Sequence, residues 1–216
     1  LFGLLLFIGL AYLFYYARVF AGGDAKLLMG LGAVLPLSNL FYSNLFLFFA
    51  FIFLLMFVGS IYGLLYSFVL VLRSKKIFSK EFKKQFNKRK GMVLIGVVFA
   101  LLSLIFVYFD LIFLLFSLVI ILFPILFIYG KAVEESCMVV SISSKKVTIG
   151  DWLYQEVKIG KRTIRPYWEG LDEKEVNLLK KSKKKVKIKQ GIPFVPAFLI
   201  AFIIFIILRK SNWSFF

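Results

Sequence analysis

The stretch LFLFFAFIFLLMFVGSIYGLLYSFVLVL, residues 45–72, decides the class of fold. It contains no charged side chain, and as a helix it would extend about 42 Å, more than the ~30 Å hydrocarbon core of a bilayer. The rest of the chain is similar, with 61% hydrophobic residues, 28 phenylalanines in 216 residues and a mean hydropathy of +0.91. Because a water-soluble core could not bury so much apolar surface, we expect an integral membrane protein.

Six apolar segments are expected to be membrane helices, so the expected fold is an all-α polytopic membrane protein with a small α+β cytoplasmic domain. The segments are 1–20, 25–37, 45–72, 92–109, 111–130 and 193–208. Because the chain begins inside an apolar run without a Met or a basic leader, we expect it to be a piece of a longer protein.

The net charge of +17 is concentrated in two regions beside apolar segments. Residues 73–90 hold nine Lys or Arg against one acid, and residues 131–189 hold fifteen against eight. Cytoplasmic loops carry such an excess of Lys and Arg, so both regions are expected to be cytoplasmic. The domains expected are membrane helices over 1–130 with a basic loop at 73–90, a small basic domain over 131–190, and a final helix with a short tail over 191–216.

The same charge rule orients the first helices. Arg18 and Lys26 place the junction between them on the cytoplasmic side with residues 73–90, so an even number of crossings must separate the two. Segments 25–37 and 45–72 supply these crossings, with an outer turn near residues 38–44. By the same parity, 92–109 and 111–130 form a hairpin with Asp110 at its outer tip.

The domain over 131–190 has an alternating pattern typical of strands at 138–142, 147–149, 157–159 and 186–188. Asp172 followed by Glu175 predicts a capping box at the start of a helix. The lysine-rich run 180–189 allows two interpretations, contact with anionic lipid headgroups or simple fixing of membrane orientation.

Several chemistries are excluded by composition. The chain has no histidine, which removes zinc sites of the HExxH type and Ser-His or Cys-His pairs. Cys137 is the single cysteine, so no internal disulfide is expected. We expect no metal and no cofactor. Nucleic acid is not an expected partner either, because the basic regions form no recognisable binding module and membrane topology explains them.

Asp24 is the one carboxylate that lies inside an apolar stretch next to glycines. Ionisable groups at membrane depth are costly and are therefore candidates for function. Gly22 and Gly23 allow a sharp turn and close approach of another chain, and Lys26 either anchors the motif at the interface or affects the pKa of Asp24. The structural alternative is that Asp24 caps the helix over 25–37.

The run GGDAKLL at 22–28, followed by GLGAVLP at 30–36, resembles the GxGD signature of intramembrane aspartyl proteases in its archaeal type IV prepilin and preflagellin peptidase form. The run GIPFVPAF at 191–198, which opens the last membrane helix, also resembles these enzymes. One departure is Ala21, which stands where the signature has its first glycine. The resemblance implies an aspartic endopeptidase with Asp24 as a catalytic residue, supported by Gly22, Gly23 and Lys26. The implied partners are prepilin or preflagellin leader peptides and membrane lipids.

Proteases of this family use a second aspartate from an earlier membrane helix, and no acid precedes Asp24 here. We therefore expect the second catalytic Asp to lie outside this chain and the chain alone to be inactive. Asp110 is a weak substitute because its expected place is a bilayer thickness away, while Asp151 and Asp172 fit a turn and a helix cap. Gly30 and Gly32 are expected to permit close helix packing.

Two other functions fit the sequence. One is a non-enzymatic membrane scaffold or transporter component in which Asp24 is structural. The other is a presenilin-like protease, which shares the chemistry but should have more spans and a Pro-Ala-Leu motif, of which Pro196-Ala197-Phe198 keeps two residues. An upstream Asp at the cytoplasmic end of a helix would favour the protease over the scaffold.

Overall fold

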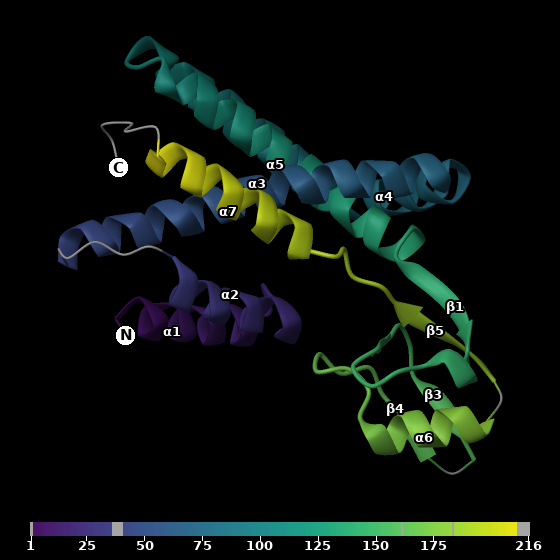
Figure 1. Cartoon of the computed structure of the whole chain (residues 1–216). Coiled ribbons are helices and arrows are strands. Elements are labelled where there is room, and N and C mark those ends of the chain that lie inside the picture. The colour runs from purple at the N-terminus through teal and green to yellow at the C-terminus, as the bar shows by residue number, and fades with distance from the viewer. Residues whose placement is uncertain (1, 36–40, 161, 183, 211–216) are drawn as a thin grey trace. The chain divides into compact units, whose positions relative to one another are not determined.

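The computed structural model is mostly helical and describes residues 2–35, 41–160, 162–182 and 184–210 (Figure 1). It divides into an N-terminal unit, residues 1–66 with 192–216, and a central unit, residues 67–191. The helices are α1 (Phe2–Tyr16), α2 (Gly22–Val34), α3 (Phe41–Arg73), α4 (Lys75–Ile105), the short 3₁₀ helix η1 (Phe106–Tyr108), α5 (Ile112–Ser136), the 3₁₀ helix η2 (Ser144–Lys146), α6 (Glu173–Ser182) and α7 (Val195–Lys210).

Three of these helices, α3, α4 and α5, are long and apolar enough to cross a membrane. Most of their large apolar side chains are exposed, for example Phe53 at 74% and Phe123 at 65%. Lipid can cover such surfaces at no cost, whereas water cannot, so the structure supports a helical membrane protein. Each of the six segments expected to be a membrane helix forms a helix at least in part, although α1, α2 and α7 are shorter. The expected outer turn lies partly in residues 36–40, outside the described residues; 41–44 belong to α3.

The N-terminal unit is a bundle of α1, α2, α7 and the part of α3 up to Tyr66. Figure 1 shows α1 and α2 side by side, and they are antiparallel, because Gly32 contacts Phe7 while Gly22 lies beside Tyr15. Phe7 stacks edge-on against Phe48 of α3 at 5.1 Å between ring centroids. The core of this unit is almost entirely Phe, Leu and Ala, which pack through dispersion without polar groups to satisfy.

In the central unit, α4 and α5 form the expected antiparallel hairpin. Ser117 Oγ donates to the Ala100 carbonyl at 3.0 Å, and Ser103 Oγ donates to the Phe113 carbonyl at 3.2 Å. At the tip, the Asp110 carboxylate accepts a hydrogen bond from the Ile112 backbone N–H at 2.8 Å. The expectation that Asp110 lies in the turn of a hairpin is therefore confirmed.

The basic segment 73–90, expected to be a loop, is helical instead. Residues 75–90 form the first half of α4, and the helix continues into the apolar half beyond a break at Arg89, whose φ and ψ are −121° and 17°. The segment contains no Pro or Gly, and its Lys, Gln and Glu residues are good helix formers. Phe78, Phe82 and Phe86, spaced by four, add stacked ring contacts along one face.

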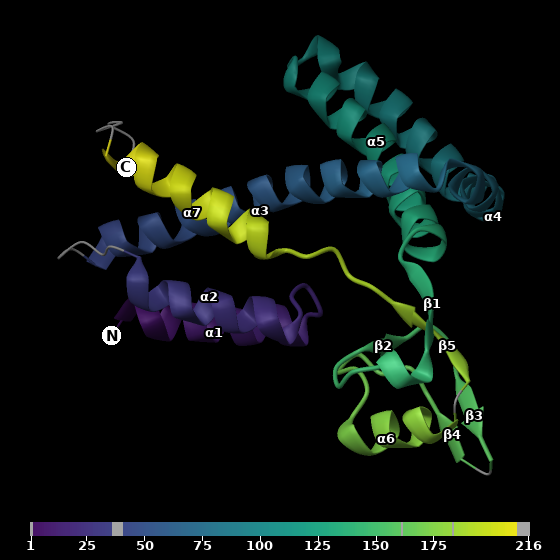
Figure 2. The same cartoon turned by 45° about the vertical axis from the view of Figure 1, so that its right-hand side comes forward.

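The small α+β part of the central unit contains a three-stranded sheet in the order β1-β5-β2 and a separate hairpin of β3 with β4 (Figure 2). The strands are β1 (Val139–Ser143), β2 (Trp152–Leu153), β3 (Val157–Ile159), β4 (Arg162–Ile164) and β5 (Lys185–Lys189). The strands predicted at 138–142, 157–159 and 186–188 are confirmed within a residue. The strand predicted at 147–149 is wrong: Val147 is buried, but the backbone turns, with the Thr148 N–H bonded to Asp151 Oδ2 at 2.8 Å.

This α+β part has its own core and is tied to the end of α5. Buried Val176, Leu179 and Val186 belong to that core. The predicted capping box is confirmed, since Glu175 N–H donates to Asp172 Oδ1 at 2.7 Å and Asp172 N–H donates to Glu175 Oε2 at 3.1 Å. Glu134 on α5 forms ion pairs with Lys131 and Lys189. Tyr154 donates a hydrogen bond to the Glu135 carboxylate, and this bond raises the pKa of the tyrosine.

Candidate functional site

Asp24 follows a tight turn that reverses the chain between α1 and α2. Arg18 adopts a left-handed conformation with φ of 60°, and the Val19 and Phe20 N–H groups both bond to the Phe14 carbonyl. This arrangement caps the last carbonyls of α1. Phe20 is only 3% exposed and stacks edge-on against Phe14 at 5.1 Å, which fixes the direction in which α2 starts.

The helix α2 begins at Gly22, three residues earlier than expected. Ala21 is its N-cap, with extended φ and ψ of −71° and 163° and no side-chain cap. Asp24 therefore lies at the third helical position, where a carboxylate interacts favourably with the helix dipole and with the free N–H groups of the first turn.

The two glycines leave the approach to Asp24 open. Gly22 and Gly23 are exposed, and a Cβ atom at Gly23 would meet nothing within 4 Å. Asp24 itself is half-buried. A second chain could thus reach the Asp24 carboxylate along the glycine pair.

Lys26 is exposed and lies about 200° around the helix from Asp24. The two side chains therefore leave α2 on opposite faces. This placement suits contact of the Lys26 ammonium group with water or with lipid headgroups at the end of the bundle.

The start of α7 lies at the same end of the N-terminal unit as Asp24. Phe20 contacts Phe194 and Phe198 at 5.7 and 5.5 Å between ring centroids. Phe194 also packs against Gly59 of α3, where a Cβ atom would lie 2.2 Å from the Phe194 ring. One aromatic layer thus joins the α1–α2 turn, α3 and the first residues of α7, and Asp24 lies one helical turn beyond it.

No second carboxylate belongs to this unit. Residues 1–66 and 192–216 contain Asp24 as their single Asp or Glu. Asp110 lies at the hairpin tip of the central unit, while Asp151 and Asp172 form a turn and a helix cap there. Among the described residues, no group of His, Cys, Asp and Glu is arranged to hold a metal ion.

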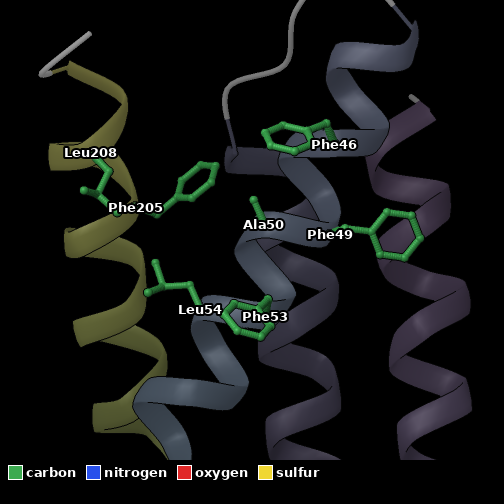
Figure 3. A pocket seen from close by; sticks show the side chains of 7 residues that line it. All are labelled: Phe46, Phe49, Ala50, Phe53, Leu54, Phe205 and Leu208. Atoms are coloured by element: carbon green, nitrogen blue, oxygen red, sulfur yellow. The ribbon is translucent and has the colours of Figure 1, made fainter. Parts of the chain in front are cut away.

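A cavity of about 500 Å³ opens between α3 and α7 (Figure 3). It is lined by Phe46, Phe49, Ala50, Phe53, Leu54, Phe205 and Leu208. These residues come from the first half of α3 and the last half of α7, so the cavity lies toward the opposite end of the bundle from Asp24. It contains no group able to perform acid–base chemistry, and its chemistry suits an acyl chain or an apolar helix.

Sequence reasoning identified Asp24 and its glycines but missed the aromatic layer of Phe20, Phe194 and Phe198 and its packing against Gly59. The signal was present, since GIPFVPAF at 191–198 was singled out, but its pairing with the α1–α2 turn depends on packing between residues far apart in sequence. Searches against family models, curated proteins and solved structures find no match to this chain.

Proposed function

We propose that this chain is the larger part of a multi-pass intramembrane aspartyl endopeptidase that cleaves the leaders of type IV pilin-like or archaeal flagellin precursors at the cytoplasmic face. The observation that carries the proposal is the placement of Asp24, half-buried in the first turn of α2 behind two exposed glycines. Asp24 is the catalytic residue contributed by this chain, and Gly22 and Gly23 give the substrate backbone access to it.

The direction of the helices supports a topology with Asp24 on the side of the basic regions. Phe7 with Phe48 marks one end of the N-terminal bundle, and Phe20 with Phe194 marks the other. The helix α3 runs from the first end toward the second and leaves toward the basic residues 75–90, while α7 starts at the second end after the lysine-rich run 180–189. Along the chain, both basic segments connect directly to helix ends on the Asp24 side of the N-terminal unit, which the positive-inside rule makes cytoplasmic.

Peptide hydrolysis by this class of site needs a pair of carboxylates. Two carboxyl groups that share a site cannot both ionise cheaply, so one holds a proton and polarises the scissile carbonyl while the other activates water. Asp24 supplies one carboxylate of the pair. The second carboxylate must come from an upstream helix that associates with the N-terminal unit.

The alternative function is a membrane scaffold or transporter component. It is favoured by the position of Asp24 in the first turn of α2, where a carboxylate stabilises a helix N-terminus. In that case the role of Asp24 is to stabilise the start of α2, and loss of the carboxylate would lower helix stability without any effect on proteolysis.

Replacement of Asp24 by Asn separates the two functions. Asn keeps the shape of the side chain but cannot exchange a proton with the attacking water, so we expect cleavage of a pilin-like leader to fall about 10³-fold or more. The assay is processing of a precursor by the enzyme expressed with its upstream helices.

Asp110→Asn is the matched control, because it makes the same chemical change at the hairpin tip. We expect the Asp110→Asn enzyme to cleave at the unchanged rate. If the Asp24→Asn enzyme processes the precursor as fast as the unmodified enzyme and differs only in a lower unfolding midpoint, the protease function is contradicted and the scaffold function is favoured.

A further inference from the structure

The basic half of α4, residues 75–90, is an amphipathic helix whose inner face rests on the end of α5. Phe78, Phe82 and Phe86 form one row, with ring centroids 5.7 and 6.4 Å apart. Phe78 stacks edge-on against Tyr129 at 5.6 Å, and the Arg89 guanidinium lies 5.6 Å from the centre of the Phe127 ring. Phe127 and Tyr129 are the last aromatic residues of α5 before its charged end, so the inner face lies at the level where α5 leaves the bilayer.

The remaining faces of this helix carry an almost unopposed positive charge. Its lysines are all exposed: Lys75, Lys76, Lys80, Lys83, Lys84, Lys88 and Lys90. Within the described part of the chain, the one ion pair recorded for them joins Lys84 to Glu81 at 3.1 Å. The Glu81 carboxylate also accepts a hydrogen bond from Gln85 at 2.7 Å, so the single acid of the segment is already engaged.

Covalent continuity holds this helix at the membrane surface at both ends. Ser74 is the single residue between α3 and α4, and the apolar half of α4 begins beyond the break at Arg89. Both flanking helices are candidate membrane spans. Because both flanking helices enter the same face of the bilayer, the rigid helix between them must lie along that face. At 1.5 Å per residue, residues 75–88 extend about 20 Å along it.

Two large apolar side chains of this helix remain exposed. Ile77 is 62% exposed and Phe86 is 40% exposed. At about 100° per residue they lie on opposite sides of Phe78 and Phe82, with Lys88 on the same side as Ile77 and Lys75 on the same side as Phe86. An apolar flank bordered by lysines matches the acyl chains and the anionic headgroups of one phospholipid monolayer.

We propose that residues 75–90 form an anionic-phospholipid contact surface, in which Ile77 and Phe86 enter the acyl region and Lys75, Lys84 and Lys88 bind headgroup phosphates. The inference rests on the membrane location of α3–α5 and does not depend on Asp24. Lipid is the occupant because the tethering places the helix in the headgroup layer and the unopposed charge selects anionic headgroups over zwitterionic ones. The break at Arg89 is the point where the chain turns from this surface into the bilayer.

The test compares anionic and zwitterionic lipids at one position. In the full chain with Cys137→Ser, a bimane fluorophore is attached at Phe86→Cys or at Ile77→Cys, and the protein is reconstituted in bilayers. The bilayers contain the same mole fraction of nitroxide-labelled phosphatidylglycerol or nitroxide-labelled phosphatidylcholine. At low salt we expect quenching by phosphatidylglycerol to exceed quenching by phosphatidylcholine by about twofold or more, since several lysines act on each headgroup.

Three matched measurements make the result decisive. Bimane at Leu118→Cys, a 56% exposed position in the apolar first half of α5, should be quenched equally by the two lipids. The triple change Lys75/Lys84/Lys88→Gln should bring the ratio at Phe86→Cys close to one, whereas Lys174/Lys180/Lys181→Gln on α6, with the same loss of charge, should not. About 1 M NaCl should abolish the preference in the unmodified sequence as well, because it shortens the Debye length to ~3 Å.

The proposal is overturned by either of two results. Equal quenching by the two lipids at both labelled positions would mean that the lysines do not select anionic headgroups. Quenching by neither lipid would mean that the helix is lifted off the bilayer, as expected if its basic face is occupied by an acidic protein partner.

Discussion

Gly32 is a residue at which α1 and α2 approach each other closely. A Cβ atom at Gly32 would lie 2.5 Å from Phe7 Cβ and 3.2 Å from the Gly3 carbonyl oxygen. Both obstacles are fixed to the backbone of α1, so the helices would have to separate. Gly30 was grouped with Gly32 in the sequence pattern, but a Cβ atom at Gly30 would meet nothing within 4 Å.

The two glycines therefore form a matched pair for mutation. We expect Gly32→Ala to destabilise the protein by about 1–3 kcal/mol through overpacking. Gly30→Ala should be neutral or stabilise it by about 0.5–1 kcal/mol, since Ala favours the helix and no neighbour is displaced. Reversible unfolding in mixed micelles measures both. Equal effects of the two changes would contradict the close contact between α1 and α2.

Asp24 shows what the sequence reveals of a candidate site. Its isolation among apolar residues, beside Gly22 and Gly23, was visible in the residues alone. Its position in the helix was not, because Ala21 has no capping side chain and the start of α2 depends on burial of Phe20 against Phe14 and Phe198. Contacts of this kind join distant residues and leave no local pattern.

At the scale of single elements, α6 illustrates a start signal that local sequence encodes fully. The reciprocal hydrogen bonds between Asp172 and Glu175 satisfy two N–H groups that the helix itself cannot. The helix then buries Val176 and Leu179 in the core of the α+β part.

We expect Asp172→Ala to weaken the start of α6 by about 1 kcal/mol, with an effect confined to the first turn and its neighbours. Hydrogen exchange of the α6 amides in the full chain measures this change. Asp151→Ala is the comparison, because that carboxylate bonds to Thr148 in a turn and should leave exchange in α6 unchanged. Unaltered exchange in the Asp172→Ala protein would show that burial of Val176 and Leu179 alone fixes the helix.

The elements that the sequence misjudged are those in which charge or burial obscured the local pattern. Residues 75–90 were expected to be a loop because of their charge, although Phe78, Phe82 and Phe86 recur at a helical spacing. Val147 suggested a strand because it is apolar, but it fills the core from a turn. The two short strands β2 and β4 are too brief to predict, and pairing with β5 and β3 defines them.

At the scale of the whole molecule, hydropathy predicted where helices form, because each of the six expected apolar segments is helical at least in part. Length separates α3, α4 and α5, which qualify as spans, from the shorter α1, α2 and α7. The proposed number of crossings rests on the charge distribution and on the direction of helices in the N-terminal bundle.

The sidedness of the chain can be measured with its single cysteine. Cys137 is half-buried just after α5, between that helix and β1, and the proposed topology makes it cytoplasmic. A membrane-impermeant maleimide should therefore label Cys137 in opened membranes only. A Tyr108→Cys variant in a Cys137→Ser background should be labelled from outside intact cells, because Tyr108 is 92% exposed at the opposite end of the α4–α5 hairpin. The reverse pattern would contradict the topology.

The central claim is that Asp24 is one half of a catalytic carboxylate pair, and reassembly of the two halves tests it most directly. The measurement is cleavage of a pilin-like leader by membranes containing this chain, alone or co-expressed with a segment that supplies the upstream helices and their Asp. We expect no cleavage by the chain alone, cleavage on co-expression, and loss of that cleavage when either Asp24 or the upstream Asp is changed to Asn. Cleavage that is unaffected by Asp24→Asn in the co-expressed pair would contradict the account.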